Sequence, residues 1–416
     1  MFYKFKFDMN SRLTTTNILL PHLAVTAFII LVMLGIAACG KSGVVSPVSS
    51  IPTLNGQTPL VVAHRGASGY LPEETLEAYV RAIELGADII EMDLVSTKDS
   101  VLICRHDPNL AISTDVATRS EYANRKKTTQ VDGETQTGWF CNDFTLSEIK
   151  NLGAISTDAE RPQQYNGLYK IPTFQEVVDL LKTKRRETGR SIGIYPETKN
   201  PTYFRNLGLS LEDRLIAMLD ASGWNSKTEK VFVQSFEPGS LKYMRSKGLK
   251  TFLIQLIDAD DVNMKTGALT YAIPYERPYD WTKAGDMRNF DVMVTSAGLA
   301  EIKTYADGIG PWKRYIISIK GIVGTDGNLM DVNGDGKINE ADGTSITPTD
   351  LISKAHKAGL FVHAYTFRNE SRRIASDYKG SAVNEYLAYY RLGIDGVFSD
   401  FTDTAIEARN VWLRER

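Results

Sequence analysis

Short apolar runs alternate with amphipathic segments from residue 60 to the C-terminal end of the chain. The runs have the length and the hydrophobicity of buried strands, and the segments between them repeat their apolar residues at helical spacing. Strands that alternate with helices along the chain are typical of a parallel sheet. The predicted strands cover residues 60–64, 88–95, 191–197, 230–235, 250–256, 291–296, 315–319, 360–366 and 394–399, and the predicted helices include residues 75–85, 174–182 and 211–219.

The number of these units predicts one α/β domain over residues 59–410. Eight strand–helix units in about 350 residues fit a (β/α)₈ TIM barrel with added loops. The predicted strands exceed eight, so one is surplus or belongs to a hairpin after Asp93. The largest interruption is a polar insertion at residues 107–170, after the second strand region. Its position predicts either a lid over the open end of the barrel or an excursion on the surface.

The N-terminal region has the pattern of an export signal over residues 1–38, with basic residues followed by an apolar stretch. The stretch ends in IAACG, which resembles the lipobox of bacterial lipoproteins and makes Cys39 the predicted lipidation site. The alternative is an uncleaved transmembrane anchor, since about 20 apolar residues can span a bilayer. Residues 39–58 are rich in Gly, Ser and Pro and predict a flexible tether. We therefore expect an exported protein, lipid-anchored to a bacterial membrane on its periplasmic or cell-surface side.

Acidic residues stand where predicted strands end, although buried strands usually lack charge. Glu91 and Asp93 are two positions apart on one strand, so both side chains leave the same face of the sheet. Glu197 follows another apolar run. Carboxylates a few Å apart repel unless a cation or a shared proton lies between them. Because Ca²⁺ and Mg²⁺ prefer oxygen ligands, these acids predict a site for a hard divalent cation.

Basic residues accompany these acids at the same strand ends. His64 and His106 have side chains that exchange protons near neutral pH. Arg65 and Lys199 suit the binding of a phosphate group. The alternative is purely structural, with salt-bridged strand ends and histidines whose hydrogen bonds are satisfied in the core.

Residues 331–342 form a separate motif, DVNGDGKINEAD. Its spacing is that of an EF-hand calcium loop, with Gly at position 6 and Asp in place of the usual Glu at position 12. No helix pair is evident on either side, so we expect a structural Ca²⁺ site, with an acidic turn that binds no metal as the alternative. The predicted ligands are Asp331, Asn333, Asp335, the backbone carbonyl of Lys337, and Asp342.

Composition and charge narrow the remaining classes of function. The 416 residues include 48 Lys and Arg against 50 Asp and Glu, a net charge of -2. Nucleic-acid binding normally needs a basic excess, so we expect no such partner. Cys104 and Cys141 are the cysteines besides Cys39. In an oxidising compartment they either form a disulfide or stay buried thiols.

The motifs around the predicted site resemble those of the glycerophosphodiester phosphodiesterases. The stretches that carry the resemblance are HRGASGYLPEETLEAY, EMDLVSTKDSVLICRHD and PETK. FTLSEI, IPTFQEV, QSFEP, YADGIGPWK and HAYTFRNE resemble the periplasmic, calcium-dependent branch of that family. The resemblance extends over residues 58–410. One departure is Glu74, where the family more often has Asn or His.

The resemblance implies a (β/α)₈ barrel that hydrolyses glycerophosphodiesters, such as glycerophosphocholine, to glycerol 3-phosphate and an alcohol. The nucleophile is either water or the neighbouring glycerol hydroxyl, which would first give a cyclic phosphate. Two alternatives are a phospholipase C- or D-like barrel that acts on intact lipids and a non-catalytic lipoprotein that binds a ligand. The implied roles are Glu91, Asp93 and Glu197 as ligands of catalytic Ca²⁺ (or Mg²⁺), His64 and His106 as the acid/base pair, and Arg65 and Lys199 as phosphate-binding residues.

Overall fold

The computed structural model describes residues 51–416. The predicted signal peptide at residues 1–38, the lipidation site Cys39 and most of the tether at residues 39–58 lie outside the described residues. Within residues 51–416, no helix combines the length and the apolar character needed to cross a membrane.

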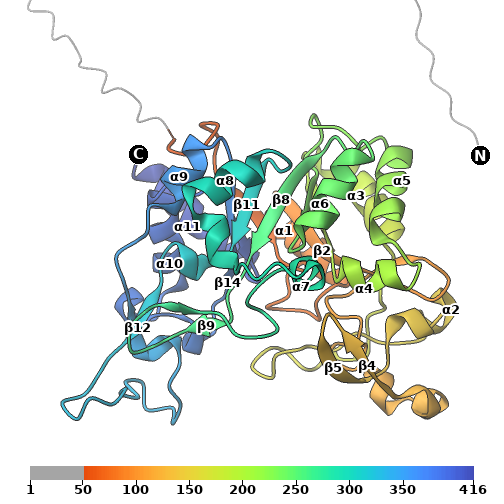
Figure 1. The fold of residues 1–416 in the computed structure, drawn as a ribbon, viewed down its shortest axis with the longest axis horizontal. Helices are drawn as coiled ribbons and strands as arrows, with labels where there is room; N and C mark the ends of the chain where they lie inside the picture. The colour runs from red at the N-terminus through yellow and green to blue at the C-terminus, as the bar shows by residue number, and fades with distance from the viewer. Residues whose placement is uncertain (1–50) are drawn as a thin grey trace, which may run out of the picture. The chain divides into compact units, whose positions relative to one another are not determined.

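Eight parallel strands close into a barrel, which confirms the predicted (β/α)₈ architecture (Figure 1). Neighbouring strands follow the order β1-β15-β14-β11-β8-β7-β6-β2, and the pairing of β1 with β2 closes the ring. A short antiparallel strand, β3 (Leu102–Cys104), extends β2 as a hairpin after Asp93. The barrel strands are β1 (Leu60–Ala63), β2 (Ile89–Ser96), β6 (Gly193–Thr198), β7 (Phe232–Ser235), β8 (Phe252–Ile257), β11 (Gly308–Pro311), β14 (Phe361–Phe367) and β15 (Gly396–Ser399).

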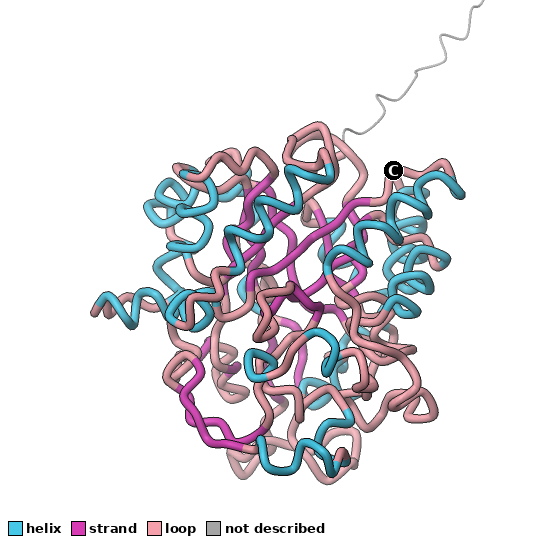
Figure 2. Tube along the Cα trace, turned by 90° about the vertical axis from the view of Figure 1, so that its right-hand side faces the viewer, coloured by secondary structure: helices cyan, strands magenta, loops and turns pink. Residues whose placement is uncertain are grey.

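Helices surround this barrel, as the tube view in Figure 2 shows. Their buried apolar side chains belong to the same hydrophobic core as those of the strands. The helix α3 illustrates why they form where they do. Thr173 and Glu176 make a reciprocal capping box at its start, and Gly189 ends it in the left-handed conformation. The main helices are α1 (Leu76–Glu84), α3 (Phe174–Thr188), α5 (Leu211–Ser222), α6 (Pro238–Ser246), α8 (Ser296–Lys303), α9 (Leu351–Lys357), α10 (Ala382–Arg391) and α11 (Thr402–Arg414).

Two predicted strands are wrong, and one barrel strand was missed. Residues 291–296 fall mostly in a 3₁₀ helix, Phe290–Val294. Residues 315–319 mostly precede β12 (Ile319–Gly321), which pairs with β13 (Gly343–Ser345) outside the barrel. The missed strand is β11, whose sequence GIGP has low intrinsic strand propensity. Tertiary packing overrides that propensity, because a Cβ on either glycine of β11 would lie 2.7 Å from a β8 side chain.

Residues 107–170 leave the barrel after β3 and contain a hairpin of β4 (Lys127–Val131) and β5 (Glu134–Gly138). Short 3₁₀ segments and the helix α2 (Leu146–Ile149) complete this segment. Cys104 and Cys141 are both buried free thiols, so the alternative of a disulfide is not found.

The barrel interior holds a layer of apolar side chains that sets the floor of the site. Because side chains on a strand alternate with a period of two, the residue two positions further along each strand faces the same way, one layer nearer the carboxyl end. The floor consists of Val62, Ile89, Tyr195, Phe232, Ile254 and Phe398, and two positions beyond them stand His64, Glu91, Glu197, Gln234, Leu256 and Asp400.

Candidate active site

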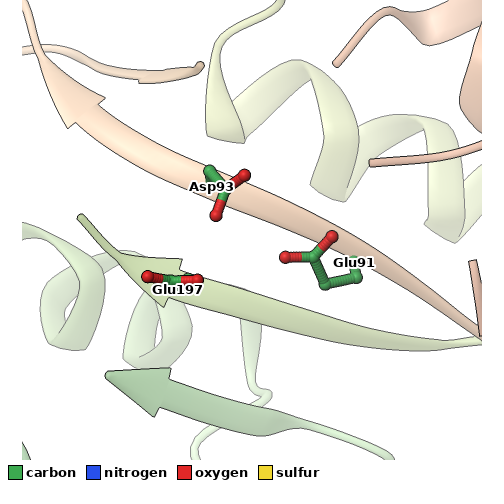
Figure 3. A group of neighbouring side chains, drawn as sticks. All are labelled: Glu91, Asp93 and Glu197. Atoms are coloured by element: carbon green, nitrogen blue, oxygen red, sulfur yellow. The ribbon is translucent and has the colours of Figure 1, made fainter. Parts of the chain in front are cut away.

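Three acidic side chains converge at the carboxyl ends of β2 and β6. The strand register places Asp93 directly opposite Glu197, and Glu91 lies two residues before Asp93 on the same face of β2 (Figure 3). One carboxylate oxygen from each of the three lies within 4.8 Å of the others, and all three residues are buried. Within residues 51–416 this is the one group of acidic, His or Cys side chains that converges so closely.

Each carboxylate in this group has a cationic or N–H partner. The backbone N–H of Arg65 donates to Glu91 at 2.7 Å, and Gln234 Nε2 donates to the other oxygen of Glu91 at 3.0 Å. Arg65 Nε lies 3.0 Å from Asp93, and Lys199 Nζ lies 3.1 Å from Glu197. The two phosphate-binding residues predicted from the sequence are therefore held by the predicted metal ligands.

Burial and mutual repulsion raise the pKa values of these acids, whereas the neighbouring cations lower them. Burial, with the charge of Asp93, raises the pKa of Glu91 well above its usual range. Burial also raises the pKa of Glu197 to about 8, against the opposing charge of Lys199. Burial disfavours a charged Asp93 as well, but the nearby Arg65 prevails and lowers its pKa. Three buried oxygen donors that cannot all ionise unaided fit a hard divalent cation.

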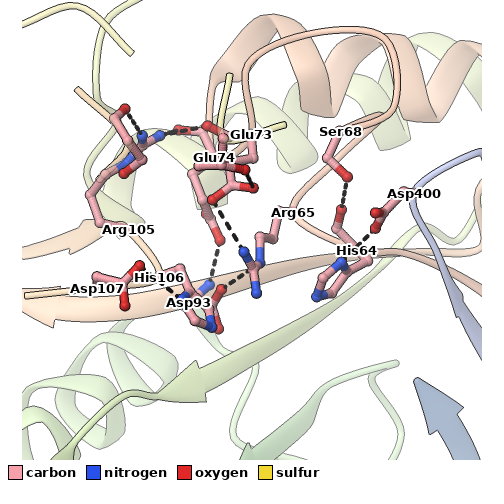
Figure 4. Close-up of polar contacts among 12 residues, drawn as sticks. His64, Arg65, Ser68, Glu73, Glu74, Asp93, Arg105, His106, Asp107 and Asp400 are labelled. Carbon is pink, nitrogen blue, oxygen red and sulfur yellow. Dashed lines mark hydrogen bonds and ion pairs between the residues drawn. The ribbon is translucent and has the colours of Figure 1, made fainter. Parts of the chain in front are cut away.

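His64 is buried at the end of β1 and hydrogen-bonds through Nδ1 to Asp400, at 2.6 Å (Figure 4). Arg161 and Arg368 both contact the other oxygen of Asp400. Burial and the charge of Arg65 lower the pKa of His64, and Asp400 only partly opposes them. His64 is therefore a neutral imidazole near pH 7, and with Nδ1 directed at Asp400 its Nε2 is available to accept a proton.

His106 follows β3 and makes a second histidine–carboxylate pair. Its Nδ1 lies 3.0 Å from Asp107, and its Nε2 lies 3.1 Å from Lys199 Nζ. The buried Arg105 precedes it and donates to the backbone carbonyls of Glu73 and Glu74, which ties the β3 end to the loop after β1. The structure thus brings both predicted histidines to the acidic group.

Sequence reasoning missed the side chains that position the predicted ones. Asp400 and Asp107 orient the histidines, Glu73 contacts Arg65 at 3.1 Å, and Gln234 contacts Glu91. A signal was available for Asp400, which directly follows the last apolar run, as the predicted residues follow theirs. Asp107 adjoins a predicted histidine and was open to the same argument.

A cavity of about 540 Å³ is lined by most of the predicted site residues, namely His64, Arg65, Glu91, His106, Glu197 and Lys199. Its wall includes Val131, Asp132, Glu134 and Gln136 from the β4–β5 hairpin, so residues 107–170 contribute to the cavity. Aromatic side chains that line it include Phe236, Tyr275, Tyr279, Phe290, Trp312 and Tyr365.

The loop 331–342 is a separate feature, and of its residues only Glu340 lines the cavity. The carboxylate of Asp331 accepts backbone N–H groups of Gly334 and Gly336, at 2.7 and 2.8 Å. The carboxylate of Asp342 is buried and accepts the N–H of Val332 at 2.7 Å. Strands β12 and β13, rather than helices, flank the loop. Asn333, Asp335 and Lys337 are exposed on it.

Known proteins match this chain over nearly all of the barrel. A glycerophosphodiester phosphodiesterase of Arabidopsis thaliana, GDPD6, is 37% identical over 364 residues, which are 84% of this chain and 85% of that protein. The glycerophosphodiester phosphodiesterase of Haemophilus influenzae is 30% identical over 367 residues, covering 84% and 89% of the two chains.

Solved structures show the same fold. A phosphodiesterase of Oleispira antarctica, in complex with the product sn-glycerol-3-phosphate, superimposes with a TM-score of 0.51 at 18% identity, covering 86% of this chain and 99% of that one. The sequence model of the glycerophosphoryl diester phosphodiesterase family matches residues 64–404. The family resemblance of the sequence motifs is thus confirmed, and the chain belongs to the glycerophosphoryl diester phosphodiesterase family.

Proposed function

We propose that this protein is a metal-dependent enzyme that hydrolyses glycerophosphodiesters to glycerol 3-phosphate and an alcohol. The observation that carries the proposal is one cluster of side chains in which three buried carboxylates meet two histidine–carboxylate pairs and two cationic side chains. The names of the relatives and the sn-glycerol-3-phosphate held by the Oleispira phosphodiesterase support the substrate class.

The ligands of the cation would be Glu91, Asp93 and Glu197, and we propose Ca²⁺, with Mg²⁺ as the alternative. When bound, the cation would polarise the phosphoryl oxygens and offset the charge that develops on them. Arg65 and Lys199 lie beside the acids and hold the phosphate by charge-assisted hydrogen bonds.

The two histidines divide the proton transfers. One removes the proton of the nucleophile, which is water or the neighbouring glycerol hydroxyl, and the other donates a proton to the leaving alkoxide. Asp400 and Asp107 each hold one ring nitrogen, which fixes the ring. This leaves Nε2 of His64 for the transfer, whereas Nε2 of His106 lies 3.1 Å from Lys199 Nζ.

The cavity wall favours a soluble diester over an intact lipid. Ile273 and Tyr275 are exposed large apolar residues near the cavity, where Pro274 and Tyr275 line the wall. Asp132, Glu134 and other polar side chains make up much of the same wall. A phospholipase would need a broader apolar rim to receive acyl chains.

We further propose that the protein is an exported lipoprotein with its lipid on Cys39 and with residues 39–58 as the tether. The support is the sequence pattern of residues 1–58. Such an anchor would hold the barrel, residues 59–410, at a membrane surface on the periplasmic or cell-surface side.

The loop 331–342 completes the proposal as a structural Ca²⁺ site. Its support is the ligand spacing and the turn held by Asp331, with Gly334 and Gly336 at positive φ. The ligands would be Asp331, Asn333, Asp335, the carbonyl of Lys337, and Asp342.

Removing one predicted ligand should abolish turnover without unfolding the protein. We expect Glu91→Gln to lower kcat/KM on glycerophosphocholine by about 10²-fold or more, the scale of losing one group that stabilises transition-state charge. Its melting temperature should not fall, because a buried, mutually repelling carboxylate is removed. The exposed Glu84→Gln variant is the control. Full activity of Glu91→Gln, or of the wild type in excess chelator, would contradict the metal assignment.

The pairing of His64 with Asp400 should control the pH dependence. If His64 is the base, kcat/KM rises with pH below about 6.5, the ordinary histidine pKa. Asp400→Asn removes a negative charge that raises the His64 pKa, so this limb should move to lower pH while the rate falls by about 10²–10⁴-fold. Asp403→Asn, which instead loses a bond with Tyr70, should leave the limb in place. If the acidic limb of the pH profile stays at the wild-type pH in Asp400→Asn, His64 is not the base.

Calcium in the loop should act on stability more than on catalysis. Ca²⁺ that binds the folded loop but not the unfolded chain raises the melting temperature by mass action. Asp331→Ala with Asp335→Ala should therefore reduce the calcium-induced rise in melting temperature and lower turnover far less than Glu91→Gln. Asp326→Ala, on the preceding turn, is the control. A double variant that keeps the full calcium-induced rise would make the loop an acidic turn.

Cys39→Ser should prevent lipidation, because only a thiol can form the thioether. Mass spectrometry of the mature N-terminus and membrane fractionation measure the result. Lipid on the wild-type N-terminus at Cys39, absent from the variant, is the expected outcome. Retention of residues 1–38 on the native protein would instead indicate an uncleaved anchor.

A further inference from the structure

A second, smaller cavity of about 190 Å³ adjoins the catalytic cavity on the side of His64. His64, Arg65, Arg368 and Arg373 line both cavities, so the two cavities adjoin at these side chains. Arg161 adds a fourth guanidinium to the smaller cavity. Three acids, Glu73, Asp158 and Asp400, line the smaller cavity beside the four arginines, so its lining has a small excess of positive charge next to His64, a proposed acid/base residue.

Acidic neighbours already engage three of these four arginines. Arg65 contacts Glu73 at 3.1 Å. Arg161 and Arg368 both contact Asp400, which also holds His64. These ion pairs position the catalytic groups, so their guanidinium groups have limited freedom to bind a further ligand.

Arg373 is different, because its guanidinium has no hydrogen-bond or ion-pair partner among residues 51–416. Its Nε is buried and unpaired. The acids near it are committed elsewhere, since Glu340 contacts Arg314 and Glu370 contacts Arg161. Only the backbone N–H of Arg373 is bonded, to the carbonyl of Glu370.

The unpaired guanidinium of Arg373 lowers the stability of the folded protein, and an anionic ligand would remove that cost. Burial, together with the positive charges of Arg368 and Arg372, lowers the Arg373 pKa. A partly buried charge without a partner costs stability, and such costs concentrate at functional sites. An anionic group in the cavity would satisfy Arg373 and would be held by bonds of the charge-assisted kind.

We propose that Arg373 binds an anionic group carried by the alcohol moiety of the substrate. This inference rests on the proposed function. The scissile phosphate lies with Arg65 and Lys199 at the acidic group, and the glycerol moiety carries no charge. A second anionic group on a glycerophosphodiester must therefore belong to the alcohol. The preferred substrates are then diesters whose alcohol bears a carboxylate or a phosphate.

Glycerophosphoserine and glycerophosphoethanolamine test this proposal, because they differ by one carboxylate. We expect the wild type to show the higher kcat/KM for glycerophosphoserine. Arg373→Met should reduce the ratio of the two kcat/KM values by about 10- to 100-fold, the factor that corresponds to one hydrogen bond to a charged group. Arg373→Lys keeps the charge and should retain part of the preference.

Arg372→Met is the matched control, since Arg372 lies on the same 3₁₀ turn but contacts Asp158 and Glu160. It should keep the wild-type ratio. Arg372→Met should lower the melting temperature, because it loses two ion pairs, whereas Arg373→Met should not. A fall in melting temperature for Arg373→Met with an unchanged ratio would assign Arg373 a structural role and overturn the proposal.

The remaining outcomes separate this inference from the proposed function. Hydrolysis of both diesters without a wild-type preference, or with a preference for glycerophosphoethanolamine, overturns the anion site alone. Absence of hydrolysis of either diester overturns the proposed function and the anion site together. Inorganic phosphate tests a free anion as the ligand. If phosphate alters glycerophosphoethanolamine turnover in the wild type but not in Arg373→Met, and the wild type shows no preference between the diesters, Arg373 binds a free anion and the proposal fails.

Discussion

Repulsion among three buried carboxylates is the constraint on which the rest of the site depends. Glu91, Asp93 and Glu197 come within 4.8 Å of one another where little water can screen them. Arg65 and Lys199 reduce that repulsion without neutralising it, since the pKa values of Glu91 and Glu197 stay raised. A divalent cation would complete the neutralisation, so the fold bears a cost that a bound cation removes without protonation of the acids.

The barrel can bear this cost because an apolar layer lies directly beneath the acids. Ile89 and Tyr195 belong to that layer, and Glu91 and Glu197 follow them by two residues on the same strands. The strand period therefore fixes both the depth and the direction of each carboxylate. The parallel register between β2 and β6 then sets Asp93 beside Glu197, with no loop involved. Ligands on rigid strands keep their geometry better than ligands on loops.

The sequence predicted those parts of the structure that follow from local periodicity. The barrel, its first strands and the acids at their ends follow from apolar runs that stop at charged residues. Strand β11 was not predicted, because GIGP lacks large apolar residues and does not alternate apolar with polar positions. The strand forms because it packs against β8. The place of Arg373 in the site was not predicted either. A 3₁₀ turn after β14 brings it to the smaller cavity, and no sequence periodicity indicates such a turn. Sequence patterns do not predict contacts between segments that lie far apart in the chain.

Glu74 shows how the site tolerates a departure from the family pattern. It is buried and accepts the backbone N–H of Asp93 at 2.8 Å (Figure 4). It also pairs with the hydroxyl of Tyr79. Burial and the charge of Asp93 raise the pKa of Glu74 well above its usual range, which favours its uncharged form. A neutral carboxyl group both donates and accepts, as Asn and a neutral His do. In its uncharged form, Glu74 supports the β2 backbone next to Asp93 without adding a fourth negative charge to a site that already holds three acids.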